Sequence, residues 1–208
     1  MSVYNEMTKE ELKQCSLLAA EAFYDYEYFS IYIPDDKRRK RFLNTLLQLE
    51  FHANFGKSGA VFLTARENGR IAAVAQLCAP DFKKPSDAEY IRRGWVRVLL
   101  AGGIRQVAAW HAMEMQASAP CHGLSGKNWY LSLLTVAKSE EGKGIGSRFL
   151  NNCLIPYVKN AGGETLSLFT NSEINRRFYE SHNFTLFDEK HFEYNGGSIG
   201  SWSYMMKL

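Results

Sequence analysis

Asn175 and Tyr179, near the end of the chain, have types and a spacing suited to acyl transfer. They lie four residues apart, shortly after Asn171-Ser172-Glu173, a stretch typical of a helix start. A step of four residues on a helix places an amide and a phenol on the same face. The ordinary pKa of tyrosine, about 10, keeps the hydroxyl protonated at neutral pH, so Tyr179 can donate a proton to a departing thiolate. The alternative is that Phe178 and Tyr179 form a plain packing pair.

A glycine turn, Glu141-Gly142-Lys143-Gly144-Ile145-Gly146, is suited to holding an anion. It follows the apolar run Trp129 to Val136, which is typical of a strand covered on both faces, and it opens a helical pattern from Ile145 to Val158. Glycines let a ligand approach the backbone, and a helix N-terminus offers N–H groups with partial positive charge. The turn therefore predicts a ligand with phosphates, although the same glycines also suit an ordinary turn.

Two known phosphate-binding motifs do not fit this turn. The nucleoside-triphosphate loop needs a lysine and a hydroxyl directly after its last glycine, whereas Ser147 and Arg148 follow Gly146. The dinucleotide fingerprint expects its third glycine where Ser147 stands. It also expects an acid after the next strand, which ends at Thr170-Asn171. Glycine spacing alone thus leaves the ligand open, and the surrounding residues must decide it.

The sequence around the turn resembles the GCN5-related N-acetyltransferases (GNAT). The stretch Val136 to Ser147 is similar to that family's cofactor motif, with five residues from the strand valine to the start of the turn. Asn175 to Phe184 is similar to the family's other signature. Within the family, His122, the run Trp129-Tyr130-Leu131 and the spacing from Asn175 to Tyr179 are most similar to the puromycin N-acetyltransferase-like branch.

The resemblance implies the GNAT fold, an α/β architecture in which helices flank a central mixed sheet of about six to seven strands. The pair Asn68-Gly69 between the apolar runs 60–65 and 71–77 predicts a hairpin. The stretch 86–119 predicts a helical insertion between this hairpin and the fourth strand, ending at Pro120. Because no repeat or linker interrupts the pattern, we expect residues 1–208 to form a single domain.

The resemblance also implies the function, an acetyl-CoA-dependent N-acetyltransferase that acts on a small-molecule amine by direct transfer through a tetrahedral intermediate. It implies that Val136 lies where its strand bulges, so that the backbone N–H polarises the thioester carbonyl, and that Tyr179 is the general acid. The cofactor contacts that it implies are Leu134, Val136, Glu141, Gly142, Lys143, Gly144, Ile145, Gly146, Ser147, Asn175, Phe178 and Tyr179. The family usually has glutamine or arginine where Glu141 stands, and this carboxylate would repel a pyrophosphate by about 1 kcal/mol or less.

The general base and the acceptor pocket are less well defined. Glu114 and His122 lie on or beside the predicted insertion, so either can take a proton directly or through water, unless they are a solvated acid and a loop histidine. In the branch named above, a glutamate usually stands where Phe169 does. Aromatic residues suited to an apolar or aromatic amine, or to plain core packing, are Phe23, Tyr24, Tyr26, Tyr28, Phe29, Tyr32, Trp95 and Trp110. The run Lys37 to Arg41 predicts a solvated helix face.

Composition argues against several other classes of protein. The net charge is +3 over 208 residues and the basic residues are spread out, so neither nucleic acid nor a membrane is expected as a partner. The four cysteines are far apart, which predicts reduced thiols and no metal site. No apolar run is long enough for a membrane span or signal segment, so we expect a cytoplasmic monomer or homodimer.

Two rival functions remain at this stage. One is a protein or peptide acetyltransferase of the same fold, against which the predicted helical cap argues, because a covered cleft suits a small acceptor. The other is a non-catalytic acetyl-CoA-binding sensor, which Glu141 keeps open and Tyr179 opposes. A hydroxyl acceptor also stays open.

Overall fold

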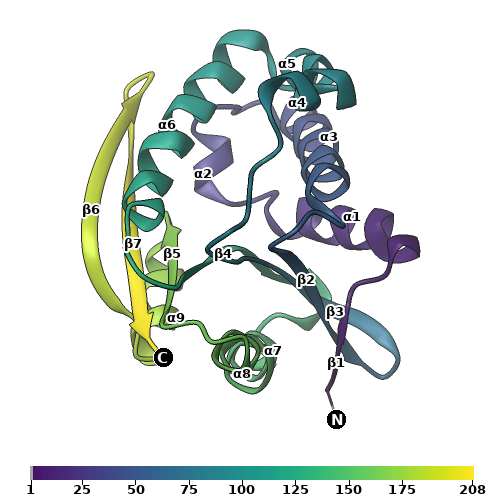
Figure 1. Ribbon diagram of the computed structural model, residues 1–208. Helices are drawn as coiled ribbons and strands as arrows, with labels where there is room; N and C mark the ends of the chain where they lie inside the picture. The colour runs from purple at the N-terminus through teal and green to yellow at the C-terminus, as the bar shows by residue number, and fades with distance from the viewer. Residues whose placement is uncertain (1) are drawn as a thin grey trace.

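The computed structural model describes residues 2–208, in which seven strands form one sheet in the order β1-β2-β3-β4-β5-β7-β6 (Figure 1). The strands are β1 (Val3–Glu6), β2 (Ala60–Glu67), β3 (Arg70–Cys78), β4 (Asn128–Val136), β5 (Thr165–Thr170), β6 (Thr185–Tyr194) and β7 (Gly197–Lys207). Strands β4 and β5 pair in parallel, and the other neighbours pair antiparallel. The predicted mixed α/β sheet is confirmed.

The hairpin between β2 and β3 turns at the predicted pair. Asn68 has φ 51° and Gly69 has φ 77°, while Glu67 and Arg70 pair across the turn. Two consecutive residues of positive φ match the right-handed twist of the flanking strands, which is why Asn-Gly suits this position.

Helices α1 to α6 cover one face of the sheet, and α7 and α8 lie on the other (Figure 1). The helices of the first face are α1 (Leu12–Ala22), α2 (Glu27–Ser30), α3 (Asp36–Asn54), α4 (Asp87–Arg93), α5 (Trp95–Gly102) and α6 (Ile104–His122). Helix α1 follows a single 3-10 turn that the Thr8–Glu11 capping box opens. Apolar residues of α1, α3 and α6 form the core of this face. None of the helices in residues 2–208 has the length and apolar character that a membrane crossing requires.

Two expectations about this helical face are wrong in detail. In the run Lys37 to Arg41, Arg39 is buried and donates to the carbonyls of Tyr24, Ile33 and Pro34, so it fastens the segment between α1 and α3. Helix α6 does not end at Pro120 but continues to His122. The carbonyl of Gln116, which the missing N–H of Pro120 leaves free, accepts a hydrogen bond from Lys190 Nζ at 2.7 Å.

The opposite face carries the helix that follows the glycine turn. It consists of α7 (Ile145–Phe149), a π-helical segment (Leu150–Leu154) and α8 (Ile155–Asn160), so it extends past the predicted end at Val158. The Ile155 N–H bonds to the Leu150 carbonyl immediately before Pro156, which has no N–H to continue the ladder. Helix α9 (Glu173–Ser181) lies on this side too, and its Tyr179 joins the second core.

Candidate active site

Strands β4 and β5 separate in the middle of the sheet. Residues 128–130 pair with residues 165–167, and the pairing stops there within the described chain. The register against β3 shows an extra residue in β4, because Gln76 opposes Leu133 whereas Leu77 opposes Leu131. The extra residue is Ser132, and a bulge at this point bends a strand away from its neighbour. The remainder of β4 therefore presents an unpaired edge to the gap.

The backbone of Leu134 and Val136 forms that edge. Ala137 N donates to the Ala72 carbonyl at 2.8 Å, so the antiparallel alternation turns the N–H groups of Leu134 and Val136 away from β3 and toward the gap. The expectation that the strand bulges at Val136 is wrong, since Val136 opposes Ala73 in a regular ladder and the bulge lies at Ser132. The bulge precedes Leu134 and Val136 in the chain, and the bend that it produces leaves the N–H groups of both residues without a strand partner.

The glycine turn has the geometry that an anion requires. Gly142 and Gly144 have φ of 74° and 70°. Within residues 2–208, the backbone N–H groups of residues 142–147 make no backbone hydrogen bond, and the first such bond after them joins Arg148 N to the Gly144 carbonyl. The Lys143 ammonium binds Glu140 at 3.0 Å. These free N–H groups stand at the start of the helix, where they would meet an anion.

The turn is connected to the rest of the predicted cofactor residues through Gly146. A Cβ atom at Gly146 would lie 3.6 Å from Val136 and 3.7 Å from Phe178, so the helix start contacts both β4 and α9. On the far side of this contact, Leu134, Asn175 and Tyr179 line a large cavity. The predicted cofactor residues thus lie on three neighbouring elements, the turn, β4 and α9, which we call the cofactor track.

This cavity, of about 1370 Å³, lies between the gap in the sheet and helices α2, α3 and α6. Two of the predicted aromatic residues lie outside it, since Tyr24 packs under Arg39 and Tyr32 stacks on Tyr194 with ring centroids 4.6 Å apart. Phe169 lines it where the resembled branch has a glutamate. The aromatic residues that line it are Phe23, Tyr26, Tyr28, Phe29, Phe51, Phe82, Tyr90, Trp95, Trp110, Tyr130, Phe169 and Tyr179.

Tyr179 meets the cavity with a phenol that stays protonated. Its side chain is 8% exposed, and burial raises its pKa well above the ordinary tyrosine value. Nearby, the Tyr26 hydroxyl lies 2.9 Å from Thr170 Oγ1 and accepts a hydrogen bond from Asn171 N at 2.8 Å. Tyr26 thus ties the helical face to the end of β5. The sequence indicated it only as one member of an aromatic run.

Both candidate bases lie on α6 and line the cavity. Glu114 is 3.9 Å from His111 Nδ1. His122 ends the helix rather than lying in a loop, and its ring packs on Tyr130 with centroids 4.6 Å apart. Burial lowers the pKa of His122, and the Lys84 ammonium lowers it further, so the imidazole is neutral at pH 7 and can accept a proton.

A further acid of the cavity, Glu50 on α3, escaped the sequence analysis. Its carboxylate accepts hydrogen bonds from Tyr90 Oη at 2.8 Å and from Asn54 Nδ2 at 3.2 Å. Burial raises its pKa, which these two hydrogen bonds only partly oppose. The available signal was an acid between Leu49 and Phe51, two residues of the apolar pattern of this helix.

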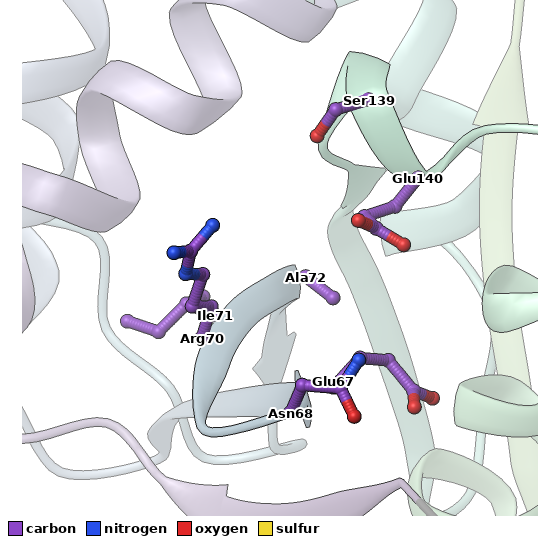
Figure 2. Close-up of a pocket in the computed structure, with 7 residues that line it drawn as sticks. All are labelled: Glu67, Asn68, Arg70, Ile71, Ala72, Ser139 and Glu140. Atoms are coloured by element: carbon purple, nitrogen blue, oxygen red, sulfur yellow. The ribbon is translucent and has the colours of Figure 1, made fainter.

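A smaller pocket of about 410 Å³ lies between the β2–β3 hairpin and the 3-10 turn Lys138–Glu140. Figure 2 shows Arg70 on one side of it and Ser139 and Glu140 on the other. None of the described residues that line it also lines the large cavity. It is therefore separate from the position of Tyr179. No three His, Cys, Asp or Glu side chains in residues 2–208 are grouped as a metal site.

The chain is similar to known acetyltransferase structures along its whole length. A protein from Corynebacterium glutamicum described as histone acetyltransferase HPA2 and related acetyltransferase is 19% identical, with TM-score 0.66 over 97% of this chain and 94% of that chain. The polyamine N-acetyltransferase of Drosophila melanogaster is 15% identical, with TM-score 0.64 over 100% of both chains. An N-acetyltransferase from Staphylococcus aureus is 16% identical, with TM-score 0.56 over 100% and 98%. At these identities the likeness shows the fold alone.

No curated protein matches this chain. A family model assigns it more directly than the solved structures do. The model of the acetyltransferase (GNAT) family matches residues 18–184, a range that contains the unpaired edge of β4, the glycine turn and α9. Because that match spans most of the sequence, the chain belongs to the GNAT family of acetyltransferases and is an acyltransferase.

Proposed function

We propose that this chain transfers an acetyl group from acetyl-CoA to the nitrogen of a small-molecule amine. The observation that carries this proposal is the cavity beside Tyr179, about 1370 Å³ in volume and bordered by helices α2, α3 and α6. A concave site of this kind suits a small acceptor better than an extended peptide. GNAT enzymes generally use acetyl-CoA and act on amine acceptors, which supports the same reading.

The cofactor track supports a role for the backbone in binding acetyl-CoA, which supplies the acetyl thioester. The free N–H groups of residues 142–147 would hold the pyrophosphate. The N–H groups of Leu134 and Val136 would bind the acyl end of the cofactor along the gap, and one of them would polarise the thioester carbonyl. Leu134 lines the cavity and Val136 does not, so we assign the polarising N–H to Leu134 and a binding role to Val136.

Two side chains would move the protons of the reaction, a general acid and a general base. Tyr179 Oη donates its proton to the sulfur when the carbon–sulfur bond breaks. The amine loses a proton as its nitrogen–carbon bond forms, and either Glu114 or His122 takes that proton. Both line the cavity, and the lowered pKa of His122 favours its neutral, proton-accepting form.

Finer assignments also belong to this proposal. Residues 1–208 would act as one domain, with the insertion of α4, α5 and α6 as its acceptor-binding part. His122, Trp129 and the Asn175–Tyr179 step support the puromycin N-acetyltransferase-like branch. The Drosophila structure, named for polyamines, supports a small amine as the acceptor class.

Two measurements test the proposed function against its rivals. Acetyl-CoA should raise the melting temperature, because a ligand that binds only the folded chain stabilises it. Thiol should then be released with at least one small amine from a panel of aminonucleosides, polyamines and peptides. Release with peptides alone would favour a protein acetyltransferase, and binding without release would favour a sensor. An unmoved melting temperature at saturating acetyl-CoA would contradict all three functions.

A further inference from the structure

The part of the large cavity bordered by α3 carries a carboxylate that acetyl transfer does not use. Glu50 lines the cavity, and both of its hydrogen-bond donors, Tyr90 Oη and Asn54 Nδ2, bind the same oxygen, Oε2. Within residues 2–208, no hydrogen bond reaches Oε1 and no ion pair involves Glu50. The carboxylate therefore retains an open acceptor.

Asn54 adds a second open acceptor beside it. Its side chain is 4% exposed and lines the same cavity, and its Oδ1 has no hydrogen-bond partner among the described residues. Because Nδ2 donates to Glu50, the orientation of the amide is fixed and Oδ1 is the atom left over. Buried polar atoms are normally satisfied, so the unpaired Oδ1 of Asn54, beside the free Oε1 of Glu50, points to a ligand that carries N–H groups.

The charges around the cavity favour a cation. Glu114 also lines it, and this second carboxylate acts with burial to raise the pKa of Glu50. The basic residues that border it are Lys84, which lies before α4, and His111 and His122 on α6, and Asp87 at the start of α4 adds a third carboxylate. His122 is neutral at pH 7, and Lys84 is exposed and lowers the pKa of Glu50 without an ion pair in the described chain. A bound ammonium would stabilise the ionised form of Glu50 and Glu114.

The cavity that contains Glu50 and Glu114 has aromatic walls. Tyr28, Trp95 and Trp110 line the cavity together with Tyr90, whose hydroxyl binds Glu50. Such faces accept methylene chains and the faces of cations alike. An acceptor with an apolar spacer and a positive group at each end would match this surface.

We propose that Glu50 and the amide oxygen of Asn54 form a cation subsite that holds a second ammonium group of the acceptor. The acceptor is then a diamine or polyamine, with its reacting nitrogen toward Glu114 and Tyr179. This inference rests on the proposed function and deepens it by naming the acceptor class. Glu50 positions the acceptor and takes no part in proton transfer.

The test measures equilibrium binding, which does not depend on turnover. Cadaverine and pentylamine share a five-carbon chain and differ in the second ammonium, and each is titrated into the full chain by calorimetry. Pentylamine lacks the second ammonium that would hydrogen-bond to the Glu50 carboxylate. Cadaverine should therefore bind about tenfold more tightly than pentylamine. Glu50→Gln should remove this preference and leave pentylamine affinity unchanged.

A matched variant controls for net charge. Glu89→Gln also removes one carboxylate, but Glu89 pairs with Lys57 and Arg93 and does not line the cavity, so the preference for cadaverine should persist. Equal affinities of the wild type for the two amines would overturn the proposal, as would equal losses for both amines in Glu50→Gln. The wild-type comparison stands even if Glu50→Gln fails to fold.

Turnover separates this inference from the proposed function. If cadaverine binds with the expected preference and no amine drives thiol release, the subsite stands and acetyl transfer falls. If pentylamine is acetylated as readily as cadaverine, and Glu50→Gln alters neither rate, transfer stands and the subsite falls.

Discussion

The two regions that meet at Tyr179 differ in composition: one consists mainly of backbone groups and the other of side chains. The proposed coenzyme side consists mainly of backbone, the unpaired edge of β4 and the free N–H groups of residues 142–147, all within one short segment of chain. The proposed acceptor side consists of side chains from α2, α3, α6 and β5, which are far apart in the sequence. A site made of backbone N–H groups tolerates an unusual side chain, such as that of Glu141. Recognition by a side-chain cavity depends on which residues line it, so we expect the proposed acceptor side to set the specificity.

Tyr179 lies where the two sides meet, and its substitution should have the largest effect. Tyr179→Phe should lower kcat by about a hundredfold, because it removes the proton donor for the thiolate. The Kd for acetyl-CoA should stay unchanged, since binding relies on backbone groups. Thiol release under steady-state conditions and calorimetry measure the two quantities.

The matched control for this substitution is Tyr157→Phe. Tyr157 lies on α8, outside the large cavity, and loses the same hydroxyl. Its turnover should equal that of the wild type. Unchanged turnover in Tyr179→Phe would remove this residue as the general acid.

The glycine turn offers the next test, because two glycines of the same conformation differ only in their place. Gly142 and Gly162 have φ of 74° and 75°, and a Cβ atom at either would meet no atom within 4 Å. Alanine at each position should cost about 1 kcal/mol of stability through backbone strain. Gly142→Ala alone should also raise the KM for acetyl-CoA, by about tenfold if a phosphate contact is lost. Equal KM values in the two variants would contradict a phosphate site at the turn.

The same contrast explains what the sequence could predict. The Asn68-Gly69 turn, the glycine turn and the step from Asn175 to Tyr179 are short-range patterns, and the structure has the expected elements around each of them. Those features depend on residues close together in the sequence, which influence the backbone in the same way in most proteins. The identity of the cofactor residues stays a prediction.

The features that the sequence did not predict depend on distant partners. Pro120 is tolerated inside α6 because Lys190 satisfies the free carbonyl of Gln116 from across the fold. The bulge at Ser132 exists only relative to the register of β3. Glu50 accepts a hydrogen bond at the cavity wall from Tyr90, which follows it by forty residues in the sequence. No local pattern contains these relations.

A smaller change on the coenzyme side concerns Glu141. The side chain is exposed, and Glu141→Gln restores a residue that the family usually has there. Removal of an exposed like charge should tighten acetyl-CoA binding about twofold to fivefold at low salt, since the repulsion is on the order of 1 kcal/mol or less. The gain should fade at high salt. A gain that salt leaves unaltered would show that charge is not the cause.

On the acceptor side, the smallest expected effect is on stability. Burial raises the pKa of Glu50 above its unfolded value, so its contribution to stability is full below the unfolded pKa and is lost as pH rises through the folded pKa. Glu50→Gln should therefore raise Tm at pH 7, and by less at pH 4.

The pKa of Glu89 shifts in the opposite direction to that of Glu50. Hydrogen bonds from Lys57 and Arg93 lower its pKa, so its contribution to stability is present above the unfolded pKa and is lost as pH falls through the folded pKa. Glu89→Gln should consequently lower Tm at pH 7 and have little effect at acid pH, as thermal melts across this range would show. A higher Tm for Glu50→Gln together with a lower Tm for Glu89→Gln at pH 7 would support the proposed binding role of Glu50. If both variants instead lowered Tm equally at pH 7, Glu50 would be an ordinary structural acid and the acceptor side would lose its proposed anchor.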